Sequence, residues 1–313
     1  MNHRANHTEM VKSKRQGHRS RWLSHRLRDL IPKRVKGTLK GAVFNYRKET
    51  SWLRLMPDFL VIGAARSGTT SLYRYLLDHP AIGAASRKEI QYFSMYYWRG
   101  IEWYRAHFPT TMHKMIVNRW RGVPFRTGEA SPYYLFHPLA PARIADLLPE
   151  IKLLVVLRNP IDRAFSHYQH EVALGVENLS FEEAIEQEPQ RLEGEVERIV
   201  SDPMYPGFRY QHFSYVSRGI YHRQLERWFL LLPRESFLIL GSERFFADPQ
   251  AAYTAVLSFL GLPPARLAEF PRHNPSKPSS LNEPTREKLG DYFASHNERL
   301  YRLLGEDFDW APR

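Results

Sequence analysis

The segment from Gly63 to Thr70 carries residue types that suit the binding of an anion. Its sequence, Gly-Ala-Ala-Arg-Ser-Gly-Thr-Thr, combines small residues with three hydroxyls and one guanidinium, that of Arg66. Small residues leave backbone N–H groups accessible, and N–H groups at the start of a helix bind phosphate oxygens. The segment is therefore predicted to be a phosphate-binding loop.

This loop differs from the loop of ordinary nucleotide hydrolases at one position. Their pattern is GxxxxGK[ST], in which the Lys reaches the terminal phosphates and the Ser or Thr holds Mg²⁺. Here Gly68 is followed by Thr69, and the only cation of the loop is Arg66. The sequence argues against a magnesium-dependent hydrolase, while a purely structural turn with a solvated Arg66 remains an alternative for the loop taken alone.

The elements around the loop are expected to be a buried strand and a helix. Residues 58–63 form a short apolar run that is long enough for a buried strand and too short for a helix. The segment after Thr70 places Leu72, Leu76 and His79 on one face and ends at Pro80. A strand, a glycine-bounded loop and a helix together present the loop to an anion.

A second anion-binding corner is predicted beyond residues 151–157, the clearest buried strand. Arg158 ends this strand, and the helix that opens at Ile161 carries Ser166 and, four residues later, His170. Ligands of open α/β sheets bind at the carboxyl ends of the strands. We therefore expect Arg158 and Ser166 to converge on one anion.

A candidate general base lies directly before an aromatic stretch, residues 92–109. Lys88 and Glu89 form a charged pair there, and a carboxylate in the wall of an apolar cleft has its pKa raised toward a value useful for proton abstraction. The alternative is a surface Lys–Glu pair beside a core aromatic cluster.

The remaining segments alternate between strands and helices. Strands are expected at 125–131 and 236–240, and helices at 138–148, 218–232, 249–260 and 283–304. This alternation predicts an α/β fold with a mostly parallel central sheet flanked by helices, in a single domain. Residues 174–217 form an acidic, proline-punctuated insertion that we expect to be too polar for a core and either to cover the site or to solvate a lobe.

Composition limits the chemistry and the partners. The 313 residues include no cysteine, which excludes a disulfide, a thiolate nucleophile and a Cys-based metal site. Residues 1–50 hold fourteen Lys/Arg and three acidic residues, whereas residues 51–313 hold 31 and 30. The basic arm suits either an amphipathic helix on an anionic membrane or polyanion, or a solvated, partly disordered tail.

Localisation is expected to be cytoplasmic, with peripheral contact to a membrane through the arm as an option. No apolar stretch resembles a secretory signal or a membrane span. No nucleic-acid partner is expected.

From residue 57 onward the chain resembles the PAPS-dependent sulfotransferases, where PAPS is 3′-phosphoadenosine 5′-phosphosulfate. The resemblance is closest to the heparan-sulfate-type carbohydrate branch, in a soluble, bacterial-type form. It is carried by four segments in the family's order, PDFLVIGAARSGTTSLYRYL, RKEIQYF with GIEWYRAHFP, LLVVLRNPIDRAFSHYQH and GIYHRQLERWF. It implies a P-loop-like fold for residues 51–313, the sulfotransferase domain.

The resemblance also implies roles for individual residues. The 5′-phosphosulfate would be bound by Arg66, Ser67, Gly68, Thr69 and Thr70, and the 3′-phosphate by Arg158 and Ser166, with Arg218 near it and Lys277 in a loop that closes over the donor. Glu89 would be the general base, with Lys88 beside it and His170 near the acceptor. No metal is implied.

Two positions depart from the branch that the chain resembles. Arg66 stands where the branch usually has Lys, and Ala130, after Glu129, stands where some relatives have a substrate-contacting Lys. Arg is permanently charged, so Arg66 neutralises a leaving phosphate without donating a proton to it.

The implied function is sulfuryl transfer from PAPS to a hydroxyl or amine of a carbohydrate. A nucleotide-dependent phosphoryl transferase, which shares the phosphate-binding loop, is one alternative. A non-catalytic polyanion- or membrane-binding protein, which the basic arm would suit, is another. The identity of the acceptor and the choice between O- and N-sulfation stay open.

Overall fold

The computed structural model describes residues 33–273 and 281–310. The chain divides into two units, Met1–Thr50 and Ser51–Arg313. In the first unit the described part is helix α2 (Lys33–Glu49), which has Leu39, Val43 and Tyr46 on one exposed face. The predictions for residues 1–32 and for Lys277 fall outside the described residues, and the role of the arm stays a prediction.

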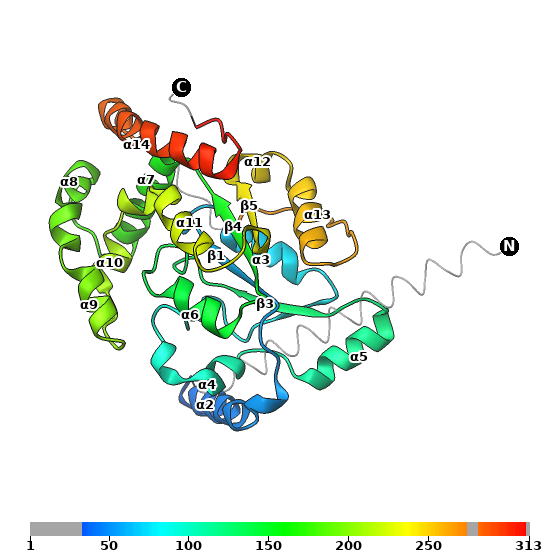
Figure 1. Cartoon of the computed structure of the whole chain (residues 1–313). Coiled ribbons are helices and arrows are strands. Elements are labelled where there is room, and N and C mark those ends of the chain that lie inside the picture. Colours follow the sequence, from blue (N-terminus) through cyan, green and yellow to red (C-terminus); the bar gives the residue numbers. More distant parts are fainter. Residues whose placement is uncertain (1–32, 274–280, 311–313) are drawn as a thin grey trace. The chain divides into compact units, whose positions relative to one another are not determined.

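Five parallel strands form the centre of the second unit (Figure 1). They are β1 (Phe59–Gly63), β2 (Ile82–Ala84), β3 (Arg126–Ala130), β4 (Lys152–Leu157) and β5 (Phe237–Gly241), in the spatial order β2-β3-β1-β4-β5. All four pairings are parallel. The predicted parallel α/β fold is confirmed, with β2 as the strand that the sequence analysis missed.

The strand order explains why the phosphate-binding loop lies where it does. Strands β3 and β2 extend the sheet from one edge of β1, and β4 and β5 extend it from the other edge. β1 therefore lies at the point where the strand order reverses. The crevice at such a point, beyond the carboxyl ends of the strands, is where open α/β sheets bind ligands. The loop after β1 and Arg158 after β4 are therefore neighbours.

Helices surround the sheet in Figure 1. They are α3 (Thr69–Leu77), α4 (Ile101–Arg105), α5 (Thr111–Arg121), α6 (Ala140–Leu147), α7 (Pro160–Ala173), α8 (Phe181–Leu192), α9 (Glu195–Ser201), α10 (Phe208–His212), α11 (Tyr221–Phe229), α12 (Ser242–Ala247), α13 (Pro249–Phe259) and α14 (Glu283–Leu304). The largest core cluster joins Val61 and Val156 of the sheet to Leu72 of α3 and Leu257 of α13. This packing holds the start of α3 against the sheet.

One predicted helix begins later than expected. The helix proposed for 218–232 is α11, which starts at Tyr221, and Ser217–Gly219 form a separate 3₁₀ turn. Arg218 points inward, where its Nη2 donates to the carbonyl of Gln211 at 2.7 Å. This inward contact keeps Arg218 in the turn before the helix.

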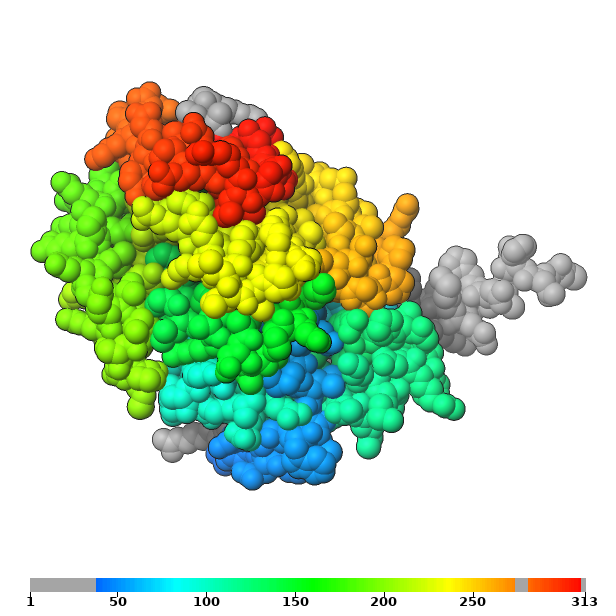
Figure 2. All heavy atoms as spheres, in the orientation of Figure 1, coloured from blue at the N-terminus to red at the C-terminus, as the bar shows by residue number. Residues whose placement is uncertain are grey.

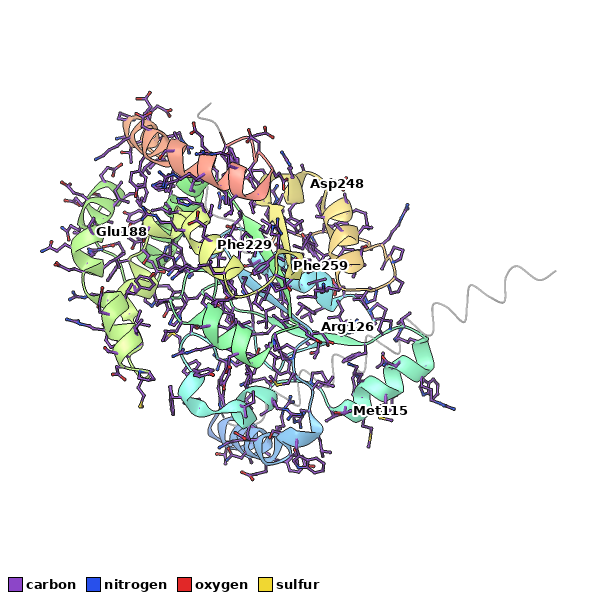
Figure 3. All side chains as sticks on the ribbon, in the orientation of Figure 1. Met115, Arg126, Glu188, Phe229, Asp248 and Phe259 are labelled. Carbon is purple, nitrogen blue, oxygen red and sulfur yellow. The ribbon has the colours of Figure 1, made fainter. Side chains whose placement is uncertain are left out.

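The acidic insertion contributes to the interior, contrary to the sequence analysis. Its helices α8 to α10 and the turn before them contain the buried carboxylates of Glu177, Glu188 and Glu195 (Figure 3 labels Glu188). Glu188 accepts hydrogen bonds from the backbone N–H groups of Val216 and Ser217 at 2.6 and 2.8 Å. Buried carboxylates are tolerated when paired in this way, so a count of acidic residues misjudged the segment.

Close contact between β1 and β3 gives a test of the sheet. A methyl group at Gly128 would lie 2.4 Å from the carbonyl oxygen of Phe59, its partner in the register. We expect Gly128→Ala to lower the free energy of unfolding by about 1–3 kcal/mol, measured by urea denaturation. Gly41→Ala is the control, because nothing lies within 4 Å of a methyl there. Equal urea midpoints for the two variants would contradict this packing.

Candidate active site

A cleft of about 710 Å³ lies beyond the carboxyl ends of β1 and β4. The predicted site residues that line it are Arg66, Ser67, Gly68, Thr69, Thr70, Lys88, Glu89, Arg158, Ser166, His170 and Arg218. All predicted site residues within the described part of the chain thus meet in one cleft.

The predicted phosphate-binding loop, residues 63–70, has the shape of an anion site. Gly68 precedes α3 with φ of 99°, and a methyl group there would lie 2.8 Å from the Phe246 ring, so only glycine fits. The first N–H groups of a helix lack intrahelical partners, which leaves those of Thr69 and Thr70 to a ligand. Ser67 is buried, and its hydroxyl has no hydrogen-bond partner among the described residues. These donors suit phosphate oxygens.

The two predicted anion-binding regions contact each other directly. Arg66 Nε donates to Ser166 Oγ at 3.1 Å, and Arg158 Nη1 donates to the Arg66 carbonyl at 3.1 Å. Burial and, secondarily, the charge of Arg158 lower the pKa of Arg66. Two guanidiniums in a partly buried corner repel each other, so a bound anion would stabilise the arrangement.

Neighbouring elements fix the position of this corner. Asn159 caps α7 by accepting a hydrogen bond from the N–H of Ile161 at 3.0 Å, and Pro160 occupies the first helical turn. The hydroxyl of Tyr221 donates to the Arg158 carbonyl at 2.9 Å. Helix α7 therefore begins one residue before the predicted start, with Ser166 on the side of the cleft.

The candidate base is linked to the loop through Lys88. Lys88 Nζ donates to Thr70 Oγ1 at 2.7 Å and lies 3.3 Å from Glu89 Oε1. The Glu89 side chain is 40% exposed. The expectation of a desolvated carboxylate in an apolar wall is therefore wrong, and the case for Glu89 rests on its position beside the loop.

A buried carboxylate supports the segment that carries Glu89. Glu129 accepts hydrogen bonds from Ser131 Oγ at 2.6 Å and from the Tyr134 hydroxyl at 2.8 Å. Ser131 Oγ in turn accepts from the N–H of Gln91 at 3.0 Å. Glu89 and Gln91 have φ of 54° and 55°, a backbone region that non-glycine residues adopt when their surroundings hold them there. Burial raises the pKa of Glu129 above its usual value.

A His–Glu–His cluster in the cleft, made by His167, Glu171 and His212, was not predicted from the sequence. Glu171 lies between two imidazoles, with Oε1 3.2 Å from His167 Nε2 and Oε2 2.8 Å from His212 Nδ1. Burial alone would raise the pKa of Glu171, but the hydrogen bonds with both histidines outweigh it and lower the pKa to about 2. Only the spacing of His167 and Glu171 was visible in the sequence, because His212 comes from the insertion.

Two further predicted site residues, His170 and Arg218, lie in different surroundings. Burial and then the charge of Arg66 lower the pKa of His170, which favours a neutral imidazole beside the loop. Arg218 is buried, and its guanidinium lies 5.1 Å from the centre of the Tyr133 ring in addition to holding the Gln211 carbonyl. Its contacts therefore support α10, and a role in binding the donor stays a prediction.

Residues 33–273 and 281–310 contain no group of three His, Cys, Asp or Glu side chains placed to hold a metal ion. None of the described helices is long and apolar enough to cross a membrane.

Residues 56–310 match the family model described as "Sulfotransferase domain". The chain belongs to the sulfotransferase family. The predicted enzyme class, a sulfotransferase, is confirmed, and the phosphoryl-transferase and non-catalytic alternatives are set aside.

Individual proteins that are similar to this chain are also named as sulfotransferases. The chain is 27% identical to "Membrane-associated sulfotransferase kil1" of Dictyostelium discoideum, over 82% of this chain and 67% of that protein. It is also 27% identical to human "Heparan sulfate glucosamine 3-O-sulfotransferase 6", over 82% and 75%. A solved sulfotransferase from Alicyclobacillus acidocaldarius superposes with a TM-score of 0.60 at 31% identity, over 82% of this chain and 99% of that one.

The His–Glu–His cluster predicts acid sensitivity. The pKa of Glu171 is about 2 in the folded protein against a usual 4.5, so its stabilising effect is complete above pH 4.5 and is lost as the pH falls toward 2. We expect Glu171→Gln to lower the free energy of unfolding at pH 7 by about 2–3 kcal/mol. The gap between the two proteins should shrink below pH 4.5 in denaturant titrations at several pH values.

The matched control is Glu197→Gln, since Glu197 is exposed on α9. A gap that stays constant from pH 7 to about pH 3 would rule out the assigned pKa of Glu171.

Proposed function

We propose that this sulfotransferase uses PAPS as donor, a carbohydrate hydroxyl or amine as acceptor, and Glu89 as general base. The observation that carries the proposal is the hydrogen bond from Arg66 to Ser166, 3.1 Å long. The 5′-phosphosulfate and the 3′-phosphate of PAPS are attached to one ribose, so a protein that binds PAPS needs two adjacent anion sites. The loop and the Arg158 corner meet that requirement.

The loop would bind the 5′-phosphosulfate. Its contacts are the N–H groups at the start of α3, the unpartnered hydroxyl of Ser67 and the guanidinium of Arg66. Arg158 and Ser166 would bind the 3′-phosphate, a group that ATP lacks. Arg66 lies between the two sites, so its charge is available to the phosphate that leaves after transfer.

Glu89 would take the proton of the acceptor. As the acceptor oxygen or nitrogen forms its bond to sulfur, the bond between sulfur and the donor phosphate breaks, and the negative charge that develops on that phosphate meets Arg66 and the loop N–H groups. Lys88 contacts both Thr70 and Glu89, so it joins the donor loop to the base. His170 would lie beside the acceptor.

A carbohydrate acceptor is proposed because several relatives, including the human one compared above, are named as heparan sulfate sulfotransferases. The basic arm, residues 1–50, remains a candidate for contact with an anionic membrane or a polyanion.

Binding of PAP (3′-phosphoadenosine 5′-phosphate), the molecule that PAPS becomes once its sulfuryl group is transferred, tests the donor site. We expect PAP to bind without Mg²⁺ and more tightly than ADP with or without Mg²⁺, in calorimetric titrations. Arg158→Ala and Ser166→Ala should each weaken PAP binding, by about tenfold or more for Arg158, which would lose a charge-assisted hydrogen bond. Arg302→Ala, at an exposed position of α14, is the control. Tighter binding of ADP with Mg²⁺ than of PAP would refute the proposed donor.

Removal of the base tests the catalytic assignment. We expect Glu89→Gln to lower kcat by about 10²- to 10⁴-fold while the Kd for PAP changes little, because the amide keeps the shape of the carboxylate but accepts no proton. Turnover is measured as transfer of labelled sulfate from PAPS to desulfated heparan sulfate oligosaccharides. Glu102→Gln on α4 is the control. Near-normal turnover of Glu89→Gln with intact PAP binding would show that another group is the base.

A further inference from the structure

Helix α5 presents an apolar face to solvent. Met112, Met115, Ile116 and Trp120 are 70%, 67%, 51% and 83% exposed. Their spacing places them on one side of the helix, and no residue of α5 is buried. Figure 3 labels Met115 on the outer side of α5, and in Figure 2 the segment around α5 projects from the visible surface.

The opposite side of α5 attaches the helix to the rest of its unit. Asn118 Oδ1 accepts a hydrogen bond from the N–H of Phe125 at 2.6 Å, and Lys114 Nζ lies 4.0 Å from Asp58 Oδ1. Thr110 caps the start of the helix, and Gly122, with φ of 64°, ends it. These contacts fix the rotation of α5, so the apolar face is held outward.

Two more apolar side chains lie beside the start of α5. Trp52 and Leu53 are also exposed, and Thr111 Oγ1 donates to the Leu53 carbonyl at 3.2 Å. Together with the four side chains of α5 they form what we term the α5 patch: Trp52, Leu53, Met112, Met115, Ile116 and Trp120. Single exposed apolar residues are common on proteins, but a contiguous group of this kind marks an interaction surface.

The charges of α5 indicate the partner. Residues 111–121 include Lys114, Arg119 and Arg121 and no acidic residue. Arg119 is exposed and four positions from Met115, so it lies within the apolar face. Basic residues combined with Trp and long apolar side chains are typical of helices that lie in the interface of an anionic bilayer. A hydroxyl-rich polysaccharide would match the Met and Ile side chains of this face less well than acyl chains do.

We propose that the α5 patch docks this enzyme on the surface of an anionic membrane. The apolar side chains enter the boundary between headgroups and acyl chains, and Arg119, which lies among them, contacts the lipid phosphates. The surface is separate from the cleft, because no residue of the patch lines it. Its residues are not those of the basic arm, residues 1–50, so the test must distinguish the two.

The absence of cysteine from the sequence allows a test at single positions. Met115→Cys in the full chain is labelled with an environment-sensitive fluorophore and mixed with vesicles of phosphatidylcholine alone or with phosphatidylglycerol. We expect a blue shift and protection from an aqueous quencher with the anionic vesicles. Leu230→Cys, at a position 84% exposed beyond α11, is the matched control and should remain accessible.

Variants then test each part of the patch by vesicle co-sedimentation of the full chain. Arg119→Gln should lower the partition coefficient by about fivefold, and Ile116→Glu by about tenfold or more. Leu231→Glu, exposed outside the patch, should have no effect.

Three outcomes would overturn the proposal. In the first, the protein binds vesicles while the label at position 115 stays accessible, which would assign binding to the arm alone. In the second, the label is protected without vesicles, which would mean that protein covers the patch. In the third, the protein binds neutral and anionic vesicles equally, or it binds neither.

Discussion

The proximity of two guanidiniums, those of Arg66 and Arg158, is the constraint on which the site depends. Like charges in a partly buried corner are unfavourable unless an anion or carboxylate offsets them. The strand order makes their proximity unavoidable, since the loop follows β1, Arg158 follows β4, and β1 and β4 are neighbours. The sheet thus produces a positive electrostatic potential at the place where a donor with two anionic groups would lie.

The protein's own carboxylates neutralise this positive charge only in part. Glu171 is the carboxylate that acts on Arg66, raising its pKa against the effects of burial and Arg158. Its oxygens are already engaged by His167 and His212, so it lowers the positive potential of the cleft without forming an ion pair with Arg66. A direct ion pair would compete with the ligand. The insertion that supplies His212 is therefore part of the electrostatic balance of the cleft.

Local patterns predicted most of the elements and the cleft in which the predicted site residues meet, and tertiary pairing decided the rest. The apolar runs of β1 and β4 are readable because each strand is buried along nearly its whole length. The placement of Arg158 and Ser166 in the cleft that the loop after β1 also lines follows from the parallel pairing of the two strands. His212 could not be placed beside Glu171, since 41 positions separate them. Nor could composition reveal that Glu188 would be buried against two backbone N–H groups, or that the Glu89 side chain would be 40% exposed.

In the proposed reaction, Lys88 links the binding of donor to the release of the base. Its ammonium is shared between Thr70 of the loop and the carboxylate of Glu89. A phosphosulfate in the loop carries more negative charge than a hydroxyl and would draw the ammonium toward the loop. The Glu89 carboxylate would then lose its contact with the Lys88 ammonium, and its oxygen would be available for the proton of the incoming acceptor. The same contact that restrains Glu89 before the donor binds would therefore make its access to the acceptor depend on the donor being in place.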